Sequence, residues 1–446
     1  MYSSHTHDNE LQDYQLPEML RVGLEDLALQ ILILDLGEPS QFLAKALDPP
    51  TAMTMKNSLK LLESLGAVEC SWKDPENGAL SLTATAEAPR PCSELNVATE
   101  LTALGFHLAS LPVEPRIGKM MIYGALFGCV DPALTIAATM SSKNPFASSF
   151  ELRQAVNEAR GHLSLHNSDH LTSLNAFNQW KQLRQTRGEK EAQMYLRENY
   201  LSRATLFQME DLRRQYASLL SEIGFLPDGF RLNSRQESFA NSNSSKDTIV
   251  RAVLCAGLYP NVVVAPRTLM ETSNARQTAG EVPWRSRQGD AYLHPSALAF
   301  SACHIPSRYA VYYEMVKTSK LYVRDSTPVN PLALLLFGGT LNLHRVQGAL
   351  TVDQWLQFRV TPQTATLLKH LRAQMEAMLL KKILSPSEEV DNKLVLKAVE
   401  ALLEERSDGA EIVRPYQFDD RQRGRGGRGR GRGGRGGRGR RSAQSD

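Results

Sequence analysis

The segment from Arg421 to Arg441 constrains this chain more than any other, because its ten arginines, ten glycines and one glutamine include no residue that could enter a core. We therefore predict a disordered tail over residues 415–446. The tail also divides the charge. Without its ten arginines, the chain has 51 − 10 = 41 basic against 48 acidic residues, so a body of formal charge −7 adjoins a tail of +10.

The body has the composition of ordinary folded domains. Its 446-residue chain is 42% hydrophobic, and this length predicts two to four domains. No apolar run reaches the roughly 18 residues that span a bilayer, and the opening MYSSHTHDNE lacks the pattern of a secretion signal. Five scattered cysteines without a CxxC pair favour a reducing, intracellular compartment.

The N-terminal region has the pattern of a winged helix. After a flexible lead over residues 1–14, one helix follows Pro17 and a second begins at Pro39, while a third is bounded by Thr51 as N-cap and Gly66 as C-cap. Two short apolar runs, AVECSW and ALSLT, flank the turn-forming KDPENG. Three helices and a hairpin predict a winged-helix domain over residues 15–83, with a plain helical cap as the alternative.

Helical periodicity dominates the middle of the chain. After an Ala-, Pro- and Thr-rich linker expected at 84–99, the runs GKMMIYGALFGC and PALTIAATMSS are apolar on nearly all sides and indicate buried helices. A long amphipathic helix ends at Gly224. We predict a helical ratchet-type bundle over residues 100–226, followed by a polar linker at 227–247.

The pattern then changes to brief strand-like runs. NVVVAP, DAYLHP, YAVYYEMVKT, KLYVRDST and LALLLFG each end at a turn-forming residue, which favours a small barrel of the oligonucleotide-binding (OB) type over residues 248–345. Two later helices, over about 364–383 and 390–405, predict a C-terminal helical extension at 346–414. The predicted fold class is therefore multidomain α+β: winged helix, helical ratchet bundle, small OB-type β-barrel and disordered RGG tail.

Catalytic motifs are missing from this sequence. It contains no GxxxxGK[ST] loop, and Gly118-Lys119 lacks the upstream glycine that would complete a phosphate cradle. His162, His166 and His170 recur every four residues, as in a helical metal site, but Gly161 and the segment Asn167–Asp169 argue against one continuous helix. We expect a polar face there, with no catalytic residue and no bound metal.

The tail favours RNA as a partner. Its RGG triplets begin at Arg425, Arg432 and Arg435, and guanidinium groups on an open backbone can pair with phosphates and stack on bases. The alternatives are a solvated charge run or a nuclear-targeting patch. The candidate RNA-binding residues of the tail are Arg425, Arg428, Arg430, Arg432, Arg435 and Arg438.

One stretch is hard to explain as a generic core. LTALGFHLASLPVEPRIGKMMIYGALFGCVDPALTIAATMSSKNPF, from Leu101 to Phe146, resembles the helicase-associated region of the DEAH/RNA-helicase-A-type ATP-dependent RNA helicases. HPSALAF and VYYEMVKTSKLYVRDSTPVNPLALLLFGG resemble the OB fold of the same family, and QLPEMLRVGLEDLALQILIL resembles the start of its winged helix. The likeness runs from about Gln15 to Gly339 and concerns the C-terminal half of such helicases.

The resemblance implies a division of labour with a motor. The two RecA-like domains of the family, which bind ATP and Mg²⁺, have no counterpart in this sequence, so we expect no cofactor in this chain and no nucleotide hydrolysis by it alone. The implied partners are single-stranded or structured RNA, a RecA-like helicase core in cis or in trans, and ribonucleoprotein components, with no membrane. The resemblance favours a cytoplasmic location, while the tail equally supports nuclear entry.

The resemblance also implies RNA-contacting positions, since RNA in this family threads between the motor and the accessory domains. They lie at the end of a ratchet helix, in a loop of the OB fold and along its strands: Ser141, Ser142, Lys143, His294, Pro295, Ser296, Lys317, Thr318, Lys320 and Arg324. Hydroxyl and cationic groups bind phosphates without reading bases. A structural contact is the alternative for each, and Arg116 and Lys119 are expected to lock domain packing.

Two functions fit these patterns. The first is the RNA-binding accessory region of an ATP-dependent RNA helicase, which guides single-stranded RNA during unwinding but has no motor of its own. The second is a stand-alone, non-enzymatic RNA-binding or scaffold protein that captures RNA with its tail.

Overall fold

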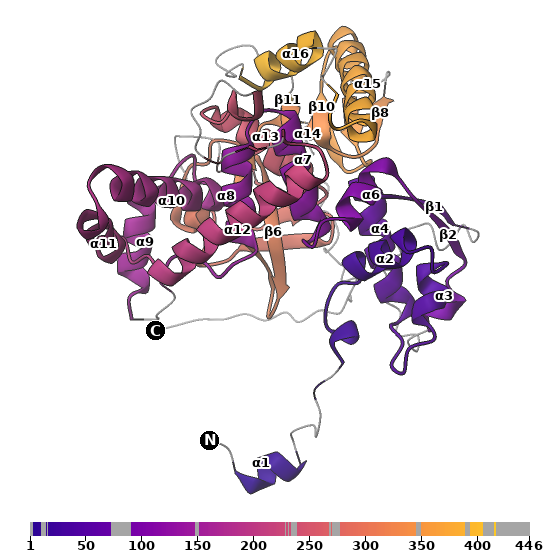
Figure 1. Ribbon diagram of the computed structural model, residues 1–446, viewed down its shortest axis with the longest axis horizontal. Coiled ribbons are helices and arrows are strands. Elements are labelled where there is room, and N and C mark those ends of the chain that lie inside the picture. Colours follow the sequence, from indigo (N-terminus) through magenta and orange to yellow (C-terminus); the bar gives the residue numbers. More distant parts are fainter. Residues whose placement is uncertain are drawn as a thin grey trace, which may run out of the picture.

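The structure is a computed structural model, and it describes residues 3–9, 15, 17–72, 91–147, 151–227, 229–230, 232, 239–266, 269, 277–344, 349–388, 393–404 and 414–415. A helical N-terminal domain, a helical bundle, a β-barrel and a C-terminal sheet with two helices follow one another along the chain (Figure 1). The six predicted arginines of the tail, from Arg425 to Arg438, lie outside the described residues.

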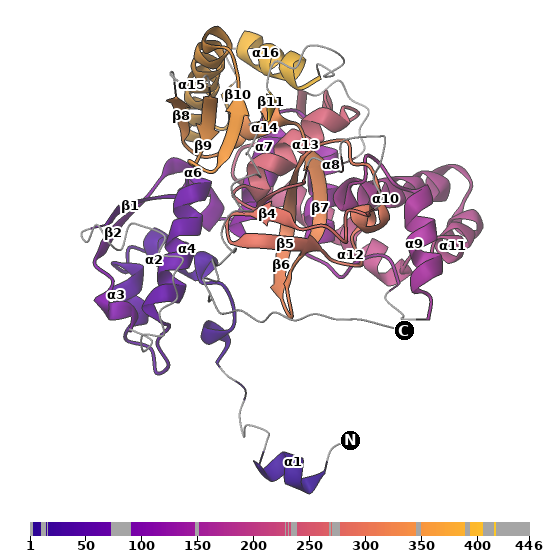
Figure 2. The ribbon, with the colours of Figure 1, turned by 180° about the vertical axis from the view of Figure 1, so that it is seen from behind.

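Short helices and one small sheet form the N-terminal domain. Its elements are η1 (Glu18–Leu20), α2 (Glu25–Ile33), α3 (Pro39–Leu43), α4 (Ala52–Leu65), β1 (Val68–Trp72), η2 (Cys92–Glu94), β2 (Val97–Leu101) and α6 (Ala103–Ala109), while α1 (Ser4–Asn9), within the predicted lead, lies apart from them (Figures 1 and 2). α4 confirms its predicted caps, since the Thr51 hydroxyl accepts the Thr54 amide and Gly66 adopts φ 75°.

The partner of β1 differs from the expected one. β1 pairs antiparallel with β2, whose register sets Val68 opposite Leu101, while the expected partner ALSLT lies outside the described residues. The predicted linker at 84–99 is therefore wrong for its last part. Cys92 and Val97 are buried in the domain core, so these residues belong to the domain despite the Pro- and Ala-rich stretch before them.

The helical bundle contains six helices in the described part of residues 114–223. They are α7 (Pro115–Leu126), α8 (Val130–Met140), α9 (Arg153–His162), α10 (Asp169–Thr186), α11 (Glu189–Glu198) and α12 (Arg203–Glu222). α8 is buried from Val130 to Ala138 except at Asp131, as its apolar composition predicts.

The predicted linker at 227–247 is partly structured. η3 (Phe239–Asn241) precedes Asn243, which is buried and whose amide group donates to Phe127 O at 2.9 Å. A polar sequence therefore packs here, because its side chains satisfy buried backbone groups of the bundle.

A closed barrel follows helix α13 (Asp247–Leu258). Its strands run in the order β3–β4–β5–β7–β6, with β5 and β7 parallel. Their bounds are β3 (Val262–Val264), β4 (Trp284–Ser286), β5 (Gly289–Leu293), β6 (Tyr309–Lys317) and β7 (Leu321–Val329), with η5 (Leu298–Ser301) between β5 and β6. β4 has only three residues and was not predicted.

The run LALLLFG is a helix, which corrects the predicted strand. α14 (Pro331–Phe337) begins at Asn330, whose side chain accepts the Leu332 amide, and the helix is buried from Leu332 to Phe337. A continuous apolar run fits a buried helix as well as a buried strand, and the Asn-Pro cap decides between them.

The C-terminal region contains a sheet in addition to its predicted helices. Strands β8 (Leu341–His344), β9 (Ala349–Val352), β10 (Leu356–Arg359) and β11 (Arg414–Pro415) pair antiparallel in the order β11–β10–β9–β8. α15 (Pro362–Leu384) and α16 (Lys393–Glu404) lie beside this sheet (Figure 2). The prediction of a purely helical extension at 346–414 is therefore wrong, because the sequence Ala349–Arg359 is two short strands.

The N-terminal domain, the bundle and the C-terminal region share one large core, and the barrel interior forms a second one. α13 packs against α7, α14 and α16, and Gly257 permits the close approach to α7, since a Cβ there would lie 2.6 Å from the Met120 Cβ. Bundle, barrel and C-terminal helices are thus held together through α13.

Candidate nucleic-acid interface

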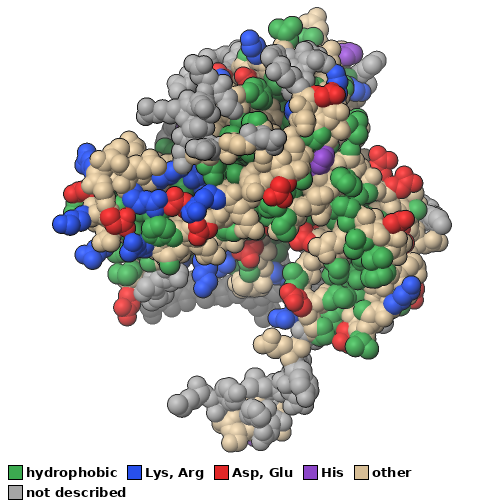
Figure 3. All heavy atoms as spheres, viewed as in Figure 1, with side chains coloured by type: hydrophobic (Ala, Val, Ile, Leu, Met, Phe, Trp, Pro, Cys, Tyr) green, Lys and Arg blue, Asp and Glu red, His purple; other side chains and the backbone are tan. Residues whose placement is uncertain are grey.

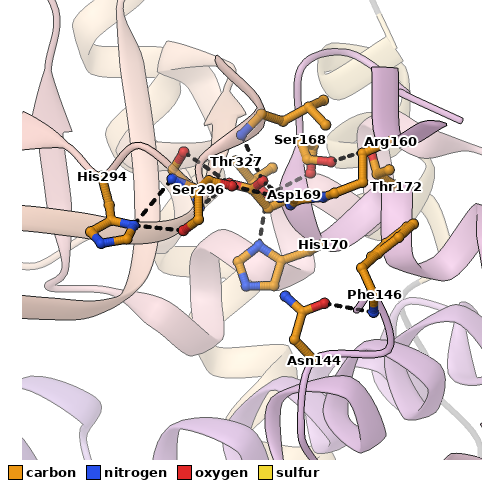
Figure 4. A network of polar contacts seen from close by, with 12 residues as sticks. Asn144, Phe146, Arg160, Ser168, Asp169, His170, Thr172, His294, Ser296 and Thr327 are labelled. Carbon is orange, nitrogen blue, oxygen red and sulfur yellow. Dashed lines mark hydrogen bonds and ion pairs between the residues drawn. The ribbon is translucent and has the colours of Figure 1, made fainter. Parts of the chain in front are cut away.

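A buried ion pair joins the bundle to the barrel. Arg160 of α9 donates from Nη2 to Oδ1 of Asp169, the first residue of α10, at 2.8 Å, and the side chains are 7% and 3% exposed (Figure 4). Such a buried pair is stable only if further hydrogen bonds satisfy the remaining polar groups. Those bonds come from the barrel.

Both members of the pair bind the barrel directly. Arg160 Nη1 donates to Ser296 O at 2.6 Å, in the loop after β5. The Asp169 carboxylate accepts the Leu298 amide at 2.9 Å and the Ser326 amide of β7 at 3.0 Å. The predicted RNA-facing loop around His294 is therefore fixed in place by side chains of the bundle.

The same ion pair reaches the segment that follows α8. The Arg160 guanidinium carbon lies 5.3 Å from the ring centroid of Phe146, which is buried. The Asn144 side chain accepts the Phe146 amide at 2.9 Å. Phe146, in the segment after α8, and Ser296, in the loop after β5, therefore both contact Arg160.

A second polar chain lies beside the first. The Thr327 hydroxyl is 2.6 Å from the Ser168 hydroxyl and 2.8 Å from Nδ1 of His170. Burial lowers the pKa of His170 to about 4, so its imidazole is neutral near pH 7. Figure 4 shows the Asn144 side chain next to the His170 ring, and Nε2 of His170 has no hydrogen-bond partner among the described residues.

The three predicted residues at the end of α8 lie on or near the surface. Ser141 is the exposed C-cap of α8, Lys143 is exposed and Ser142 is half-buried. Ser141 also interacts with the Tyr216 phenol, which partly offsets the burial that raises the pKa of Tyr216. The Ser142 hydroxyl lies 3.3 and 3.5 Å from two backbone oxygens. Both distances are long for a hydroxyl donor, so these hydrogen bonds are weak.

His294 and Ser296 form one local unit. The Ser296 amide donates to Nδ1 of His294 at 3.1 Å, and the Ser296 hydroxyl lies 2.7 Å from the same nitrogen. Burial and the neighbouring Arg324 lower the pKa of His294. Nδ1 of His294 therefore faces Ser296, and Nε2 lies 3.4 Å from the Arg324 guanidinium.

The remaining predicted residues lie on β7 and in the turn that precedes it. Arg324 pairs with Glu314 of β6 at 3.5 Å, and its guanidinium lies 3.4 Å from the His294 ring. Lys317, Thr318 and Lys320 are exposed in the turn between β6 and β7, where the Thr318 amide donates to Lys320 O. This turn joins the fourth and fifth strands of the barrel, a connection that binds ligands in OB folds.

The structure thus brings the predicted positions together in part. Phe146, three residues after Lys143, and the loop Pro295–Ser296 both contact Arg160, and His294 adjoins Arg324, whereas the turn at Lys317–Lys320 lies at the far end of β7. Arg116 and Lys119 bind other domains: Arg116 donates to Tyr313 O and Lys119 to Leu65 O.

Sequence reasoning missed the residues that build the interface. Arg160, Asp169 and Thr327 carried no motif, although Ser168 before α10 was a readable N-cap. Tyr292 and Tyr322 were also missed. Both are half-buried at the outward positions of AYLH and LYVR, where alternation with buried residues was a usable signal.

The three spaced histidines do not share a helix. His162 ends α9, His166 lies in the turn at φ 53° and His170 is inside α10, so the predicted break in the helix is confirmed. Within the described part of the chain, no three His, Cys, Asp or Glu side chains are grouped to hold a metal ion. No helix among the described residues is long and apolar enough to span a bilayer.

The surface around the bundle is mixed in charge. In Figure 3, Lys and Arg side chains are frequent over the bundle at the left, with acidic side chains between them, while hydrophobic side chains gather over the N-terminal domain at the right. On this face the body therefore presents no uniformly basic area.

Three parts of the chain match known families. Residues 114–194 match the helicase associated domain (HA2), ratchet-like, residues 250–341 match the oligonucleotide/oligosaccharide-binding (OB)-fold, and residues 348–405 match the C-terminal domain in RNA helicases. The closed five-stranded barrel agrees with the second match.

Curated relatives extend these matches. The chain is 32% identical to ATP-dependent RNA helicase DHX29 of Homo sapiens, over 88% of this chain and 26% of the relative. It is 36% identical to DExH-box ATP-dependent RNA helicase DExH1 of Arabidopsis thaliana, over 87% of this chain and 35% of the relative. It is 35% identical to ATP-dependent DNA/RNA helicase DHX36 of Bos taurus, over 84% of this chain and 34% of the relative. The chain therefore spans about a quarter to a third of these relatives.

Proposed function

The chain carries the domains of the C-terminal half of the DEAH-type RNA helicases, and on this premise we propose that it guides single-stranded RNA for a RecA-like motor during unwinding. The RNA would pass between the end of α8 and the outward face of the barrel. The observation that supports this proposal most is the Arg160–Asp169 pair, because Arg160 contacts both Ser296 and Phe146, which lies three residues after the predicted RNA-contacting residues Ser141–Lys143.

The polar groups near that pair suit a phosphate backbone. Ser141 and Lys143 are exposed on the bundle side, and the half-buried His294 and Arg324 lie on the barrel side. Hydroxyl, ammonium, imidazole and guanidinium groups all bind phosphate oxygens and none of them requires a particular base. Guidance without sequence selection is what an unwinding motor needs from its accessory domains.

We further propose that residues 15–101 form a winged helix, supported by α2, α3, α4 and the β1–β2 sheet, and that the RGG tail adds sequence-independent RNA affinity. The proposed partners are RNA, the helicase core and ribonucleoprotein components. The proposed location is the cytoplasm, and nuclear entry would depend on the tail.

Replacing Ser141 and Ser142 by Glu tests the path. Both positions are exposed or half-buried, so the new carboxylates would face solvent and repel RNA phosphates. In a helicase reconstituted with a RecA-like motor, we expect RNA affinity and unwinding rate to fall roughly tenfold, or about 1.4 kcal/mol. The measurement is a strand-displacement assay with RNA titration.

Ser110→Glu is a matched control for this variant. Ser110 is the exposed C-cap of α6, the same cap position that Ser141 holds in α8, but it lies in the N-terminal domain. Unwinding should be unchanged by Ser110→Glu. Equal unwinding rates for Ser141/Ser142→Glu and the parent protein would contradict the proposed path.

The one Gly-Lys pair of the sequence, Gly118-Lys119, does not fit a Mg²⁺-nucleotide. The Gly118-Lys119 pair is unsuitable because Lys119 is buried within α7, where its ammonium donates to Leu65 O at 2.9 Å. Burial lowers the pKa of Lys119 to about 8. We propose that ATP and Mg²⁺ are bound by a RecA-like helicase core, in cis or in trans.

We accordingly expect the purified chain to hydrolyse no ATP, with or without RNA. A phosphate-release assay should give the rate of the buffer blank, whereas the same chain joined to a RecA-like motor should show RNA-stimulated turnover. Stimulated hydrolysis by the isolated chain would show that it contains a nucleotide site after all.

A further inference from the structure

We propose that Tyr292 and Tyr322 form a base-stacking shelf for single-stranded RNA on the outward face of the barrel, between the His294 loop and the β6–β7 turn. The inference rests on the proposed RNA-guiding function and assigns it a second kind of contact, with bases instead of phosphates. Neither tyrosine belongs to the buried ion-pair network.

The two rings are neighbours across the parallel pair of strands β5 and β7. The pairing sets Tyr292 directly opposite Tyr322, and their ring centroids are 6.5 Å apart. Ala291, Leu293 and Val323 on either side of them are buried in the barrel, so strand alternation turns both tyrosines outward. Both tyrosine side chains remain half-buried, so packing against the barrel holds the part of each ring that lies nearest the strand.

The shelf links two sets of predicted RNA-contacting residues. His294 stands at one end, with its ring centroid 6.1 Å from that of Tyr322, and Arg324 lies beside it. Lys320 stands at the other end, with Nζ 4.0 Å from the Tyr292 ring centroid. The four residue steps from Lys320 to Arg324 span roughly 13 Å of strand, which leaves room for bases between phosphates bound at the two ends.

The geometry selects unpaired bases. The ring planes of Tyr292 and Tyr322 are inclined by 49°, so two bases that each lay on one ring could not stay stacked on each other. A duplex keeps its bases parallel and could not use both rings, whereas a single strand can turn between them. We infer a ligand of at least two unstacked nucleotides.

Stacking contributes more than charge on this face. Glu314 pairs with Arg324, and Asp290 is the register partner of Arg285 on β4, so acidic groups offset much of the positive charge. Lys320 now covers Tyr292, but an exposed cation–π contact is weaker than base stacking, and a base can displace the ammonium toward its own phosphate. The affinity of this shelf should therefore change little with salt.

Leucine at both positions tests the shelf, because Tyr292→Leu and Tyr322→Leu retain apolar bulk against the barrel and remove only the aromatic faces. The complete chain is titrated with fluorescein-labelled oligouridine of ten nucleotides and with an abasic ribose-phosphate oligomer of the same length. The titrations are made at 0.5 M salt, where the arginines of the tail contribute least.

For oligouridine we expect affinity to fall roughly tenfold for each leucine, and phenylalanine at the same positions to restore it. Binding of the abasic oligomer should be the same in all variants. Equal loss for both oligomers, or oligouridine affinity unchanged by leucine, would overturn the shelf while leaving RNA guidance intact. A parent chain that binds neither oligomer at any salt concentration would instead overturn the proposed function.

Discussion

Replacing Asp169 by Asn should lower the free energy of unfolding of the bundle–barrel junction by about 3–5 kcal/mol, the range for breaking a buried ion pair from one side. The variant leaves the Arg160 guanidinium charged and buried without its partner. It also replaces one carboxylate oxygen by an NH₂ group, so either the Leu298 amide, which donates to Oδ1, or the Ser326 amide, which donates to Oδ2, loses its acceptor.

Amide hydrogen exchange measures this loss of stability at the bundle–barrel junction itself. The amides of Leu298 and Ser326 should exchange roughly 100-fold faster or more, since 2.7 kcal/mol of local stability corresponds to that factor. Asp211→Asn is the control. The Asp211–Arg214 pair is 70% and 65% exposed, so its loss should cost less than about 1 kcal/mol.

A double variant separates two effects on stability: the loss of hydrogen bonds to Asp169 and the burial of an unpaired Arg160 guanidinium. Adding Arg160→Met to Asp169→Asn removes the unpaired cation and should recover part of the lost stability, although one barrel amide remains without its acceptor. If Asp169→Asn alone changed exchange no more than Asp211→Asn, the pair would not be the anchor of the His294 loop.

Deleting Arg421–Arg441 should remove most of the RNA affinity at physiological salt. If six of the ten arginines bind phosphates of a single strand, the slope of log K against log salt should become less negative by about 4. Counterion release alone would then account for up to about four decades of affinity at 0.1 M salt. The measurement is a titration of labelled RNA at several salt concentrations.

Two further variants identify what the tail contributes. Changing its ten arginines to glutamine keeps the length and should weaken binding as much as the deletion. Changing them to lysine keeps the charge, so the salt slope should persist while any stacking by guanidinium planes is lost. A deletion that kept both the affinity and the salt slope would place the main RNA site in the body.

The two variants differ in kind. Asp169→Asn should act on the geometry of the interface and leave the salt slope unchanged, whereas the tail deletion should act on the slope and leave hydrogen exchange at Leu298 unchanged. Measuring the salt slope and the hydrogen exchange of Leu298 in both variants therefore tests whether the geometry of the interface and the electrostatic attraction of RNA are independent in this protein.

Local signals made much of the fold predictable. α4 was bounded by Thr51 and Gly66, whose cap geometry depends only on neighbouring residues. α14 was mistaken for a strand because its run of leucines has no polar face to reveal the period, and the Asn330-Pro331 signal was overlooked. β4, with three residues, is too short for any periodicity.

The interface was less accessible from sequence, because its bonds are not local. Asp169 binds amides of Leu298 and Ser326, which are 129 and 157 positions away. The parallel pairing that sets Tyr292 beside Tyr322 likewise follows from the strand order of the closed barrel. Family resemblance supplied the exposed serines and lysines, but the buried groups that hold them required the structure.

The pairing of β11 with β10 has a consequence for how RNA is delivered. Arg414 lies opposite Arg359 and Pro415 opposite Phe358, so Arg421 begins only six residues beyond a fixed point of the body, at most about 20 Å away. If the arginines bind RNA as proposed, the captured RNA would be held close to the body, so a weak guiding surface could be occupied without binding tightly.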